Sequence, residues 1–193
     1  MKFAVALTLL LALAAPALAQ DSLNCRQVAL WPESPELDAE AWSIALDPER
    51  NLAFLGTFLY DSIWENWTFC ILDISDLSQP RLLSANIVRD QGDSYDVHYN
   101  SNRLYLGTEG DGFTIWDVSD PTAPESLGVF DVPYAAFRMA VAGDYAYIAA
   151  LGHGLRVADV SDPRNPVEVG HCAIGSAWDV AVAGELAYVV TNG

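Results

Sequence analysis

Alternating hydrophobic and polar residues recur in short runs from residue 42 to the end of the chain. At residues 178–183 the run Trp-Asp-Val-Ala-Val-Ala is followed by Gly184-Glu185 and then by Leu-Ala-Tyr-Val-Val. Two such runs joined by a glycine-containing pair predict a β-hairpin. Residues 137–149 repeat this pattern, with Gly143-Asp144 at the turn. No stretch beyond the N-terminal segment has a helical period, so the sequence predicts an all-β fold.

Three markers recur in a constant order and show that the chain is built from repeated units. The first is a turn of the form Asp-x-Ser-Asp followed by proline, beginning at Asp73, Asp117 and Asp159. The second is an aromatic residue within an apolar strand: Phe54, Tyr105, Tyr147 and Tyr188. The third is an aromatic residue that opens a strand: Trp42, Tyr95, Phe137 and Trp178. From the second unit on, the copies are spaced by 41–42 residues, a period typical of β-propeller blades, and the first unit is longer.

Each complete unit predicts four antiparallel strands. After the hairpin at 137–149, a third strand follows at 154–160 and a fourth at 167–172. The turn between them reads Ser-Asp-Pro-Arg-Asn-Pro, where Asp and Ser side chains accept backbone N–H bonds and proline presets φ. Four such strands match the size of one propeller blade.

Residues 154–166 (GLRVADVSDPRNP) and 180–189 (VAVAGELAYV) resemble the LVIVD repeat family. The resemblance extends from about residue 42 to the end. It implies a β-propeller exported to the surface or exterior of bacterial or archaeal cells. It implies no common catalytic residue. The units it delimits are 42–94, 95–136, 137–177 and a partial unit, 178–193.

Three complete four-stranded blades and a partial one predict an incomplete ring. Residues 20–41 form a leading segment with a strand at 25–31, which we expect to complete another blade. A partial copy of a longer repeat protein and an open assembly both fit this arrangement, and the sequence leaves the two open.

The N-terminus has the order of a secretory signal. Lys2 precedes an apolar run from Phe3 to Leu13, and Ala17-Leu18-Ala19 supplies a cleavage site. We therefore predict a signal peptide at 1–19, with the mature chain beginning at Gln20. An uncleaved anchor is the alternative, but the run is short for a membrane span, and no later segment is long enough. The predicted location is secreted, periplasmic or cell-surface.

Charge and cysteine content narrow the function classes further. The net charge is −17, with 26 acidic and 9 basic side chains, which excludes a nucleic-acid partner because phosphate binding needs clustered Lys and Arg. Cys25, Cys70 and Cys172 lack the spacing of a zinc site. They fit small buried side chains or a single disulfide, whose pairing the sequence leaves open.

The candidate binding face lies at the loops above the first strand of each blade. The longer second-to-third-strand loop of the first unit carries Tyr60, Trp64 and Trp67. On the same face, the first strands begin with polar residues near the central channel: Ser43, Asp96, Arg138 and Asp179. Exposed aromatic side chains on a loop are typical of binding surfaces. The alternative is that these aromatic residues cover the blade as a hydrophobic lid.

The sequence favours a non-enzymatic binding or scaffold module for a protein or extracellular ligand of unknown identity. It contains no nucleophile elbow, and we predict no catalytic residue and no cofactor. The competing hypothesis is an exported hydrolase with a metal in the channel. Its candidate ligands are Asp96, His98 and Asp179, because carboxylates from different blades can converge there.

Overall fold

Every regular element in the described part of the chain is a β-strand, as the sequence predicts. The computed structural model describes residues 8–11, 26–30, 40–58, 68–88, 94–108, 112–131 and 136–192. Among them, three four-stranded antiparallel sheets follow one another along the chain, and a two-stranded hairpin comes last. This is a β-propeller architecture with three complete blades and a partial fourth.

Each blade uses its strands in chain order, from the inner strand to the outer one. The first blade contains β3 (Glu40–Asp47), β4 (Leu52–Phe58), β5 (Phe69–Asp73) and β6 (Arg81–Asn86). The second contains β7 (Ser94–Asn100), β8 (Arg103–Thr108), β9 (Phe113–Asp117) and β10 (Glu125–Phe130). The third contains β11 (Arg138–Ala142), β12 (Tyr145–Ala149), β13 (Leu155–Asp159) and β14 (Val167–Cys172). The partial fourth blade contains β15 (Ser176–Ala183) and β16 (Leu186–Asn192).

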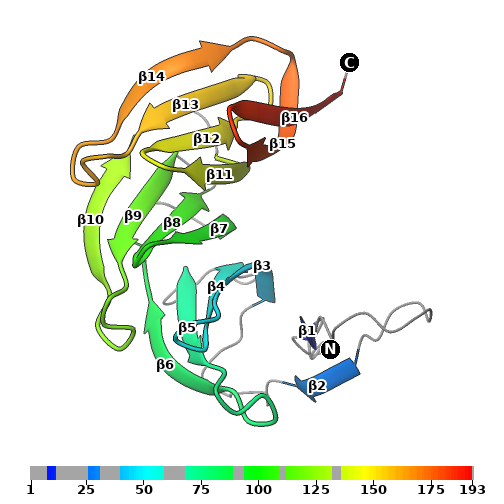
Figure 1. Cartoon of the computed structure of the whole chain (residues 1–193), viewed down its shortest axis with the longest axis vertical. Coiled ribbons are helices and arrows are strands. Elements are labelled where there is room, and N and C mark those ends of the chain that lie inside the picture. The colour runs from blue at the N-terminus through cyan, green and yellow to red at the C-terminus, as the bar shows by residue number, and fades with distance from the viewer. Residues whose placement is uncertain are drawn as a thin grey trace.

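The blades form an open arc, as Figure 1 shows, with β3, β7, β11 and β15 along its concave edge. Strands β6, β10 and β14 lie on the convex side. The incomplete ring expected from the repeat count is therefore the shape of the described chain. Along the concave edge, each inner strand contacts the inner strand of the next blade.

The leading segment forms a strand where the sequence predicts one. Strand β2 (Arg26–Leu30) pairs antiparallel with β1 (Thr8–Leu11) in a separate two-stranded sheet. Because β1 belongs to the predicted signal peptide, the addition of residues 25–31 to a blade of the mature chain stays a prediction. No helix in the described part of the chain has the length and apolar character needed to cross a membrane.

The hydrophobic core lies between blades, because each sheet buries residues on both faces. Phe54 and Phe69 of the first blade pack with Leu104 and Leu106 of the second in one buried cluster. A second cluster joins the second and third blades and includes Phe113 and Ile148. Each blade is thus held mainly by its neighbours, as in other repeat architectures.

The Asp-rich turns bind their own backbone, as the sequence predicts. Asp117 Oδ1 accepts a hydrogen bond from the Ser119 backbone N–H at 2.8 Å, and Asp120 Oδ1 accepts one from Thr122 at 2.9 Å. Asp162 Oδ1 likewise accepts one from the Arg164 N–H at 3.0 Å. These bonds fix the turn between the third and fourth strands, so that each blade presents the same turn to the preceding blade.

These turns meet a small residue on the outer strand of the preceding blade. The hydroxyl of Ser84 donates to the Pro121 carbonyl oxygen at 2.8 Å. At the equivalent position of the next blade, Gly128 lies so close to the Pro163 carbonyl oxygen that a Cβ atom would collide with it. The third copy is Gly170, around which the described chain leaves open space.

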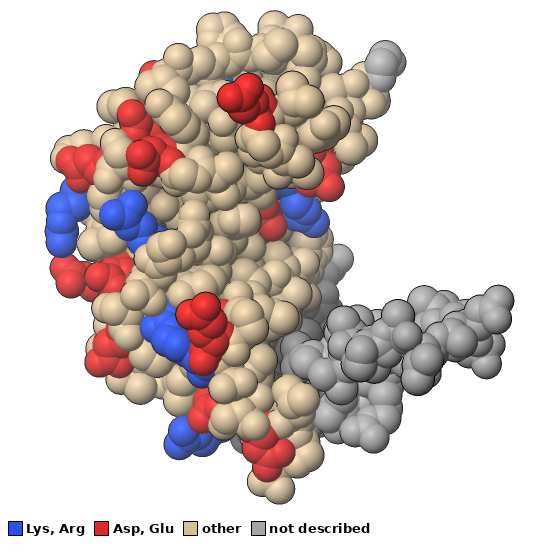
Figure 2. Space-filling model, viewed as in Figure 1, with Lys and Arg blue, Asp and Glu red and all other residues tan. Residues whose placement is uncertain are grey.

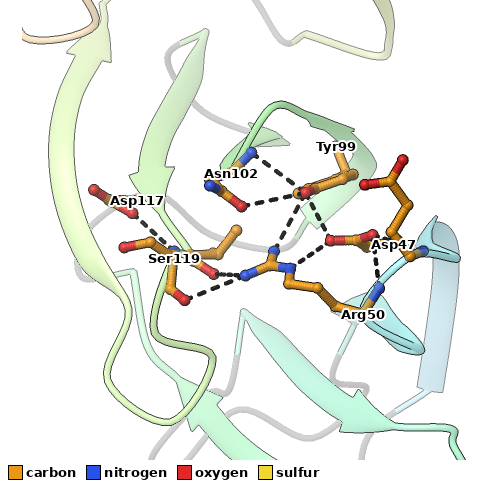
Figure 3. A network of polar contacts seen from close by, with 8 residues as sticks. Asp47, Arg50, Tyr99, Asn102, Asp117 and Ser119 are labelled. Atoms are coloured by element: carbon orange, nitrogen blue, oxygen red, sulfur yellow. Dashed lines mark hydrogen bonds and ion pairs between the residues drawn. The ribbon is translucent and has the colours of Figure 1, made fainter.

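A polar network also joins the first two blades, and Figure 3 shows its side chains. The buried Asp47 carboxylate accepts hydrogen bonds from Arg50 Nε and, at 2.7 Å, from the Tyr99 hydroxyl. Arg50 Nη1 donates across the blade boundary to the carbonyl oxygens of Val118 (2.9 Å) and Ser119 (3.2 Å). The inner hairpin of one blade is therefore tied to the outer turn of the next.

Candidate functional site

A row of four aromatic side chains runs along the concave edge from blade to blade. The ring centroids of Trp42 and Tyr95 lie 6.3 Å apart, those of Tyr95 and Phe137 5.7 Å, and those of Phe137 and Trp178 5.5 Å. Each residue comes from the start of a different inner strand, so the row crosses every blade boundary in the described chain. We call these four residues the inner row.

A register shift, as in a β-bulge, lies at three of these four side chains. In the β3–β4 pair the register passes from Ala41 opposite Thr57 to Ser43 opposite Gly56, which leaves Trp42 as the additional residue. Corresponding shifts make Tyr95 and Trp178 the additional residues of their strands, whereas Phe137 directly precedes β11, whose pairing with β12 is regular. A bulge bends the strand and changes the direction of a side chain, and bulges are common beside functional sites. Three of the four residues of the inner row therefore lie at a repeated irregularity of the inner strands.

The ends of the inner row are accessible to solvent. Trp42 is 47% exposed and Trp178 is 44% exposed, whereas Tyr95 and Phe137 are half-buried. Trp and Tyr are enriched at interaction sites, where they bury apolar area and still offer a polar group.

Three charged residues follow the aromatic positions and lie beside the inner row. Arg138 donates from Nη1 to the carbonyl oxygens of Tyr95 and Phe137, and its guanidinium lies 5.1 Å from the centre of the Phe137 ring. Asp96 Oδ2 accepts a hydrogen bond from the Met139 backbone N–H at 2.7 Å. Asp179 Oδ1 accepts one from the N–H of Val180 at 2.8 Å. The site thus draws residues from three blades.

The electrostatics of Asp96 show how closely these groups interact. Burial raises the pKa of the Asp96 carboxyl to about 6, while the Met139 hydrogen bond and the Arg138 charge act in the opposite direction. The negative charge of Asp179 adds to the increase. A carboxylate with a raised pKa is held in an environment that disfavours its charge, and an additional positive group would relieve this cost.

The structure brings part of the predicted binding face together. Asp96, Arg138 and Asp179 lie near enough for Arg138 and Asp179 to affect the pKa of Asp96, and their part in binding stays a prediction. Ser43 occupies the equivalent position of the first blade, and its hydroxyl is buried without a hydrogen-bond partner in the described chain. The predicted loop residues Tyr60, Trp64 and Trp67 lie outside the described residues.

The metal hypothesis gains no support from this geometry. Within the described ranges, no three His, Cys, Asp or Glu side chains are placed to hold a metal ion together. Asp96, His98 and Asp179 are therefore not such a group. His98 is half-buried, and burial lowers its pKa. Among the cysteines, Cys70 and Cys172 are free thiols, and Cys25 lies outside the described residues. Burial raises the pKa of Cys70 to about 12.

The four residues of the inner row served as repeat markers in the sequence, and their arrangement as one surface was not predicted. The pattern predicts a core position for an aromatic residue at the start of a strand, because strict alternation places it on a buried face. The missing information is the register shift at Trp42, Tyr95 and Trp178, which no residue type predicts. The signal that could have found the row is the polar residue directly after each aromatic.

Comparisons with known proteins agree with the repeat pattern. The family model described as LVIVD repeat matches residues 50–85, 91–132, 135–173 and 174–193. The solved structure of the computationally designed Ika4 protein has a TM-score of 0.64 at 11% identity, covering 86% of this chain and 92% of that chain. The designed Ika8 protein gives a TM-score of 0.59, also at 11% identity, covering 86% of this chain and 46% of that chain. No curated protein matches. At this identity the likeness concerns the fold alone.

Proposed function

The chain belongs to the LVIVD repeat family, and from this premise we propose that it is an exported, non-enzymatic binding or scaffold module. Its ligand is a protein or another extracellular molecule, bound at the concave edge of the arc. The observation that carries the proposal is the inner row, with Trp42 and Trp178 nearly half exposed and charged residues beside it.

Two properties of the site support binding without catalysis. Its side chains come from different blades that pack rigidly on one another, which gives a preorganised surface. Its hydrogen bonds hold Asp96, Arg138 and Asp179 on backbone groups, and none joins a nucleophilic side chain to a base. Such an arrangement suits recognition, in which a few aromatic and Arg side chains supply most of the binding energy.

Export is supported by the N-terminal sequence and by the family, whose members are typically exported. We expect protein recovered from the periplasm or medium of an expressing bacterial host to begin at Gln20, because Ala17-Leu18-Ala19 forms a signal cleavage site. N-terminal sequencing measures this directly. Material that is recovered outside the cytoplasm with Met1 still attached would contradict cleavage, and material found only in the cytoplasm would contradict export.

The binding role predicts that truncating the inner row abolishes capture of the natural ligand. The immobilised mature chain is incubated with the extracellular fraction of the native cells, in parallel with Trp178→Ala. Tyr145→Ala is the matched control, since Tyr145 is 43% exposed against 44% for Trp178 but lies at the opposite end of its blade. We expect the Tyr145→Ala control to retain the bound species. We expect Trp178→Ala to lose affinity for it by at least about ten-fold, as for a hot-spot side chain. Equal retention by both variants would refute the inner row as the binding site.

A further inference from the structure

Charge is unbalanced at the inner row, where two carboxylates accompany one guanidinium. Arg138 directs its hydrogen bonds to the carbonyl oxygens of Tyr95 and Phe137, and no ion pair in the described chain joins it to Asp96 or Asp179. Each carboxylate accepts its hydrogen bond from a backbone N–H group. Because an ionised carboxylate can accept about four hydrogen bonds, both retain capacity for a further donor.

Arg138 also shows which type of group the inner row accommodates. Its guanidinium lies over the Phe137 ring, 5.1 Å from the centroid, in the geometry of a cation–π contact. The exposed rings at the two ends of the row, Trp42 and Trp178, have indole faces that attract cations more strongly than phenyl rings do. The protein therefore places one of its own cations on the row and leaves its strongest cation-binding rings accessible.

The length of the row favours an extended ligand over a small isolated cation. Successive ring centroids are 5.5–6.3 Å apart across four inner strands. Side chains at alternate positions of an extended peptide repeat every 6–7 Å or so, since each residue rises about 3.3 Å. An extended peptide could therefore place alternate side chains along successive rings of the inner row.

The charge of the whole chain favours the same partner. The net charge is −17, and Figure 2 shows acidic side chains dispersed over the visible face, with acidic and basic side chains meeting at the concave edge. A field of this sign draws basic ligands toward the protein and raises their association rate. Dispersed charge gives no selectivity of its own, so the choice of partner rests on the site.

We propose that the inner row, together with the carboxylates of Asp96 and Asp179, recognises an extended basic segment of a partner protein, with Lys or Arg side chains at alternate positions. This inference rests on the proposed function, because it assigns the chemistry of the ligand bound at the same site. The basic side chains stack on the exposed indole rings and donate to the two carboxylates.

The test uses defined peptides and the tryptophan fluorescence of the mature chain. The probe is a blocked heptapeptide in which arginine alternates with glycine, compared with a peptide carrying neutral citrulline in place of arginine. We expect the arginine peptide to bind at least about ten-fold more tightly, and Asp179→Asn to remove about ten-fold in affinity, the ratio expected for one lost charge-assisted contact. Equal affinity for the two peptides overturns the inference.

Asp144→Asn is the matched control for general charge attraction. It removes the same single charge from the exposed turn between β11 and β12, away from the inner row. We expect this variant to bind the arginine peptide as the unmodified chain does. If Asp144→Asn weakens binding as much as Asp179→Asn, the attraction is non-specific and the inference fails.

The protonation of Asp96 provides an independent readout. Its pKa of about 6 means that the carboxylate forms between pH 5 and pH 7, so affinity for the arginine peptide rises over this interval. Asp96→Asn removes the rise, and a rise that persists in this variant contradicts the role of Asp96.

If the natural ligand is captured through Trp178 but neither peptide binds, the proposed function stands and the basic-segment inference fails. If capture does not depend on Trp178, the proposed function itself fails.

Discussion

Replacement of Gly128 by alanine is expected to destabilise the chain by about 3 kcal/mol, at the upper end of the cost of overpacking. The added Cβ atom would meet the Pro163 carbonyl oxygen and the backbone of Arg164, which belong to the turn of the next blade. Because these are backbone atoms, no rotamer change can relieve the collision. The second and third blades must separate locally, and the buried cluster between them loses contacts.

Gly170→Ala is the control for Gly128→Ala, because it makes the same chemical change at the same position of the repeat. The described chain leaves open space around Gly170, so the added methyl group meets nothing there. We expect its free energy of unfolding to change by less than about 0.5 kcal/mol, as for most exposed substitutions. Urea unfolding of the two variants measures the difference. Equal midpoints for both variants would show that the turn does not press on the outer strand.

Asp47→Ala is expected to lower the free energy of unfolding by about 2 kcal/mol. This is below the cost of breaking a fully buried ion pair, because the Arg50 side chain is 30% exposed. Removing the carboxylate deprives Arg50 Nε and the Tyr99 hydroxyl of their shared acceptor. Arg50 then loses the group that directs it toward the Val118 carbonyl oxygen of the second blade.

The effect of Asp47 should depend on pH in a defined direction. Burial by itself raises the pKa of Asp47, but hydrogen bonds from Arg50 and Tyr99 outweigh burial and hold the pKa below its usual value of 3.8. A carboxyl with a lowered pKa stabilises the fold above the pKa of the unfolded chain and loses this effect as pH falls through the folded value. Urea midpoints of Asp47→Ala and the unmodified chain should therefore differ at pH 7 and converge in strong acid. A difference that stays constant down to strong acid would contradict the ionic role.

The hairpin glycines and the Asp-rich turns predicted the blades well because each performs a local task. Gly143 and Gly184 adopt positive φ values of 58° and 59° at the two predicted hairpin turns. Asp120 and Asp162 bind the backbone of their own turns. Such contacts lie within a few residues of one another, so residue type and spacing were sufficient to predict them.

The candidate site was predicted in part, because it depends on relations between blades. Aligning the repeats placed Asp96, Arg138 and Asp179 at one end of the inner strands, and the structure brings them together. Trp42, Tyr95 and Trp178 lie at register shifts, which strict alternation of residue types cannot reveal. The role of Gly128 depends on contact with a turn more than thirty residues later in the sequence. From the sequence alone, a glycine within a strand indicates only a weaker strand.

The start of each inner strand has a consequence for how specificity can change. The aromatic residue there is followed by a position that varies among the blades, while the strand pairing beyond it is regular. This position holds Ser43, Asp96, Arg138 and Asp179, so aspartate occurs in two of the four blades. Each blade therefore offers one variable position beside an aromatic residue, and the arc presents four such positions in a row. If the proposed binding role holds, we expect a substitution at one of these positions to change which ligand binds without changing the fold that displays it.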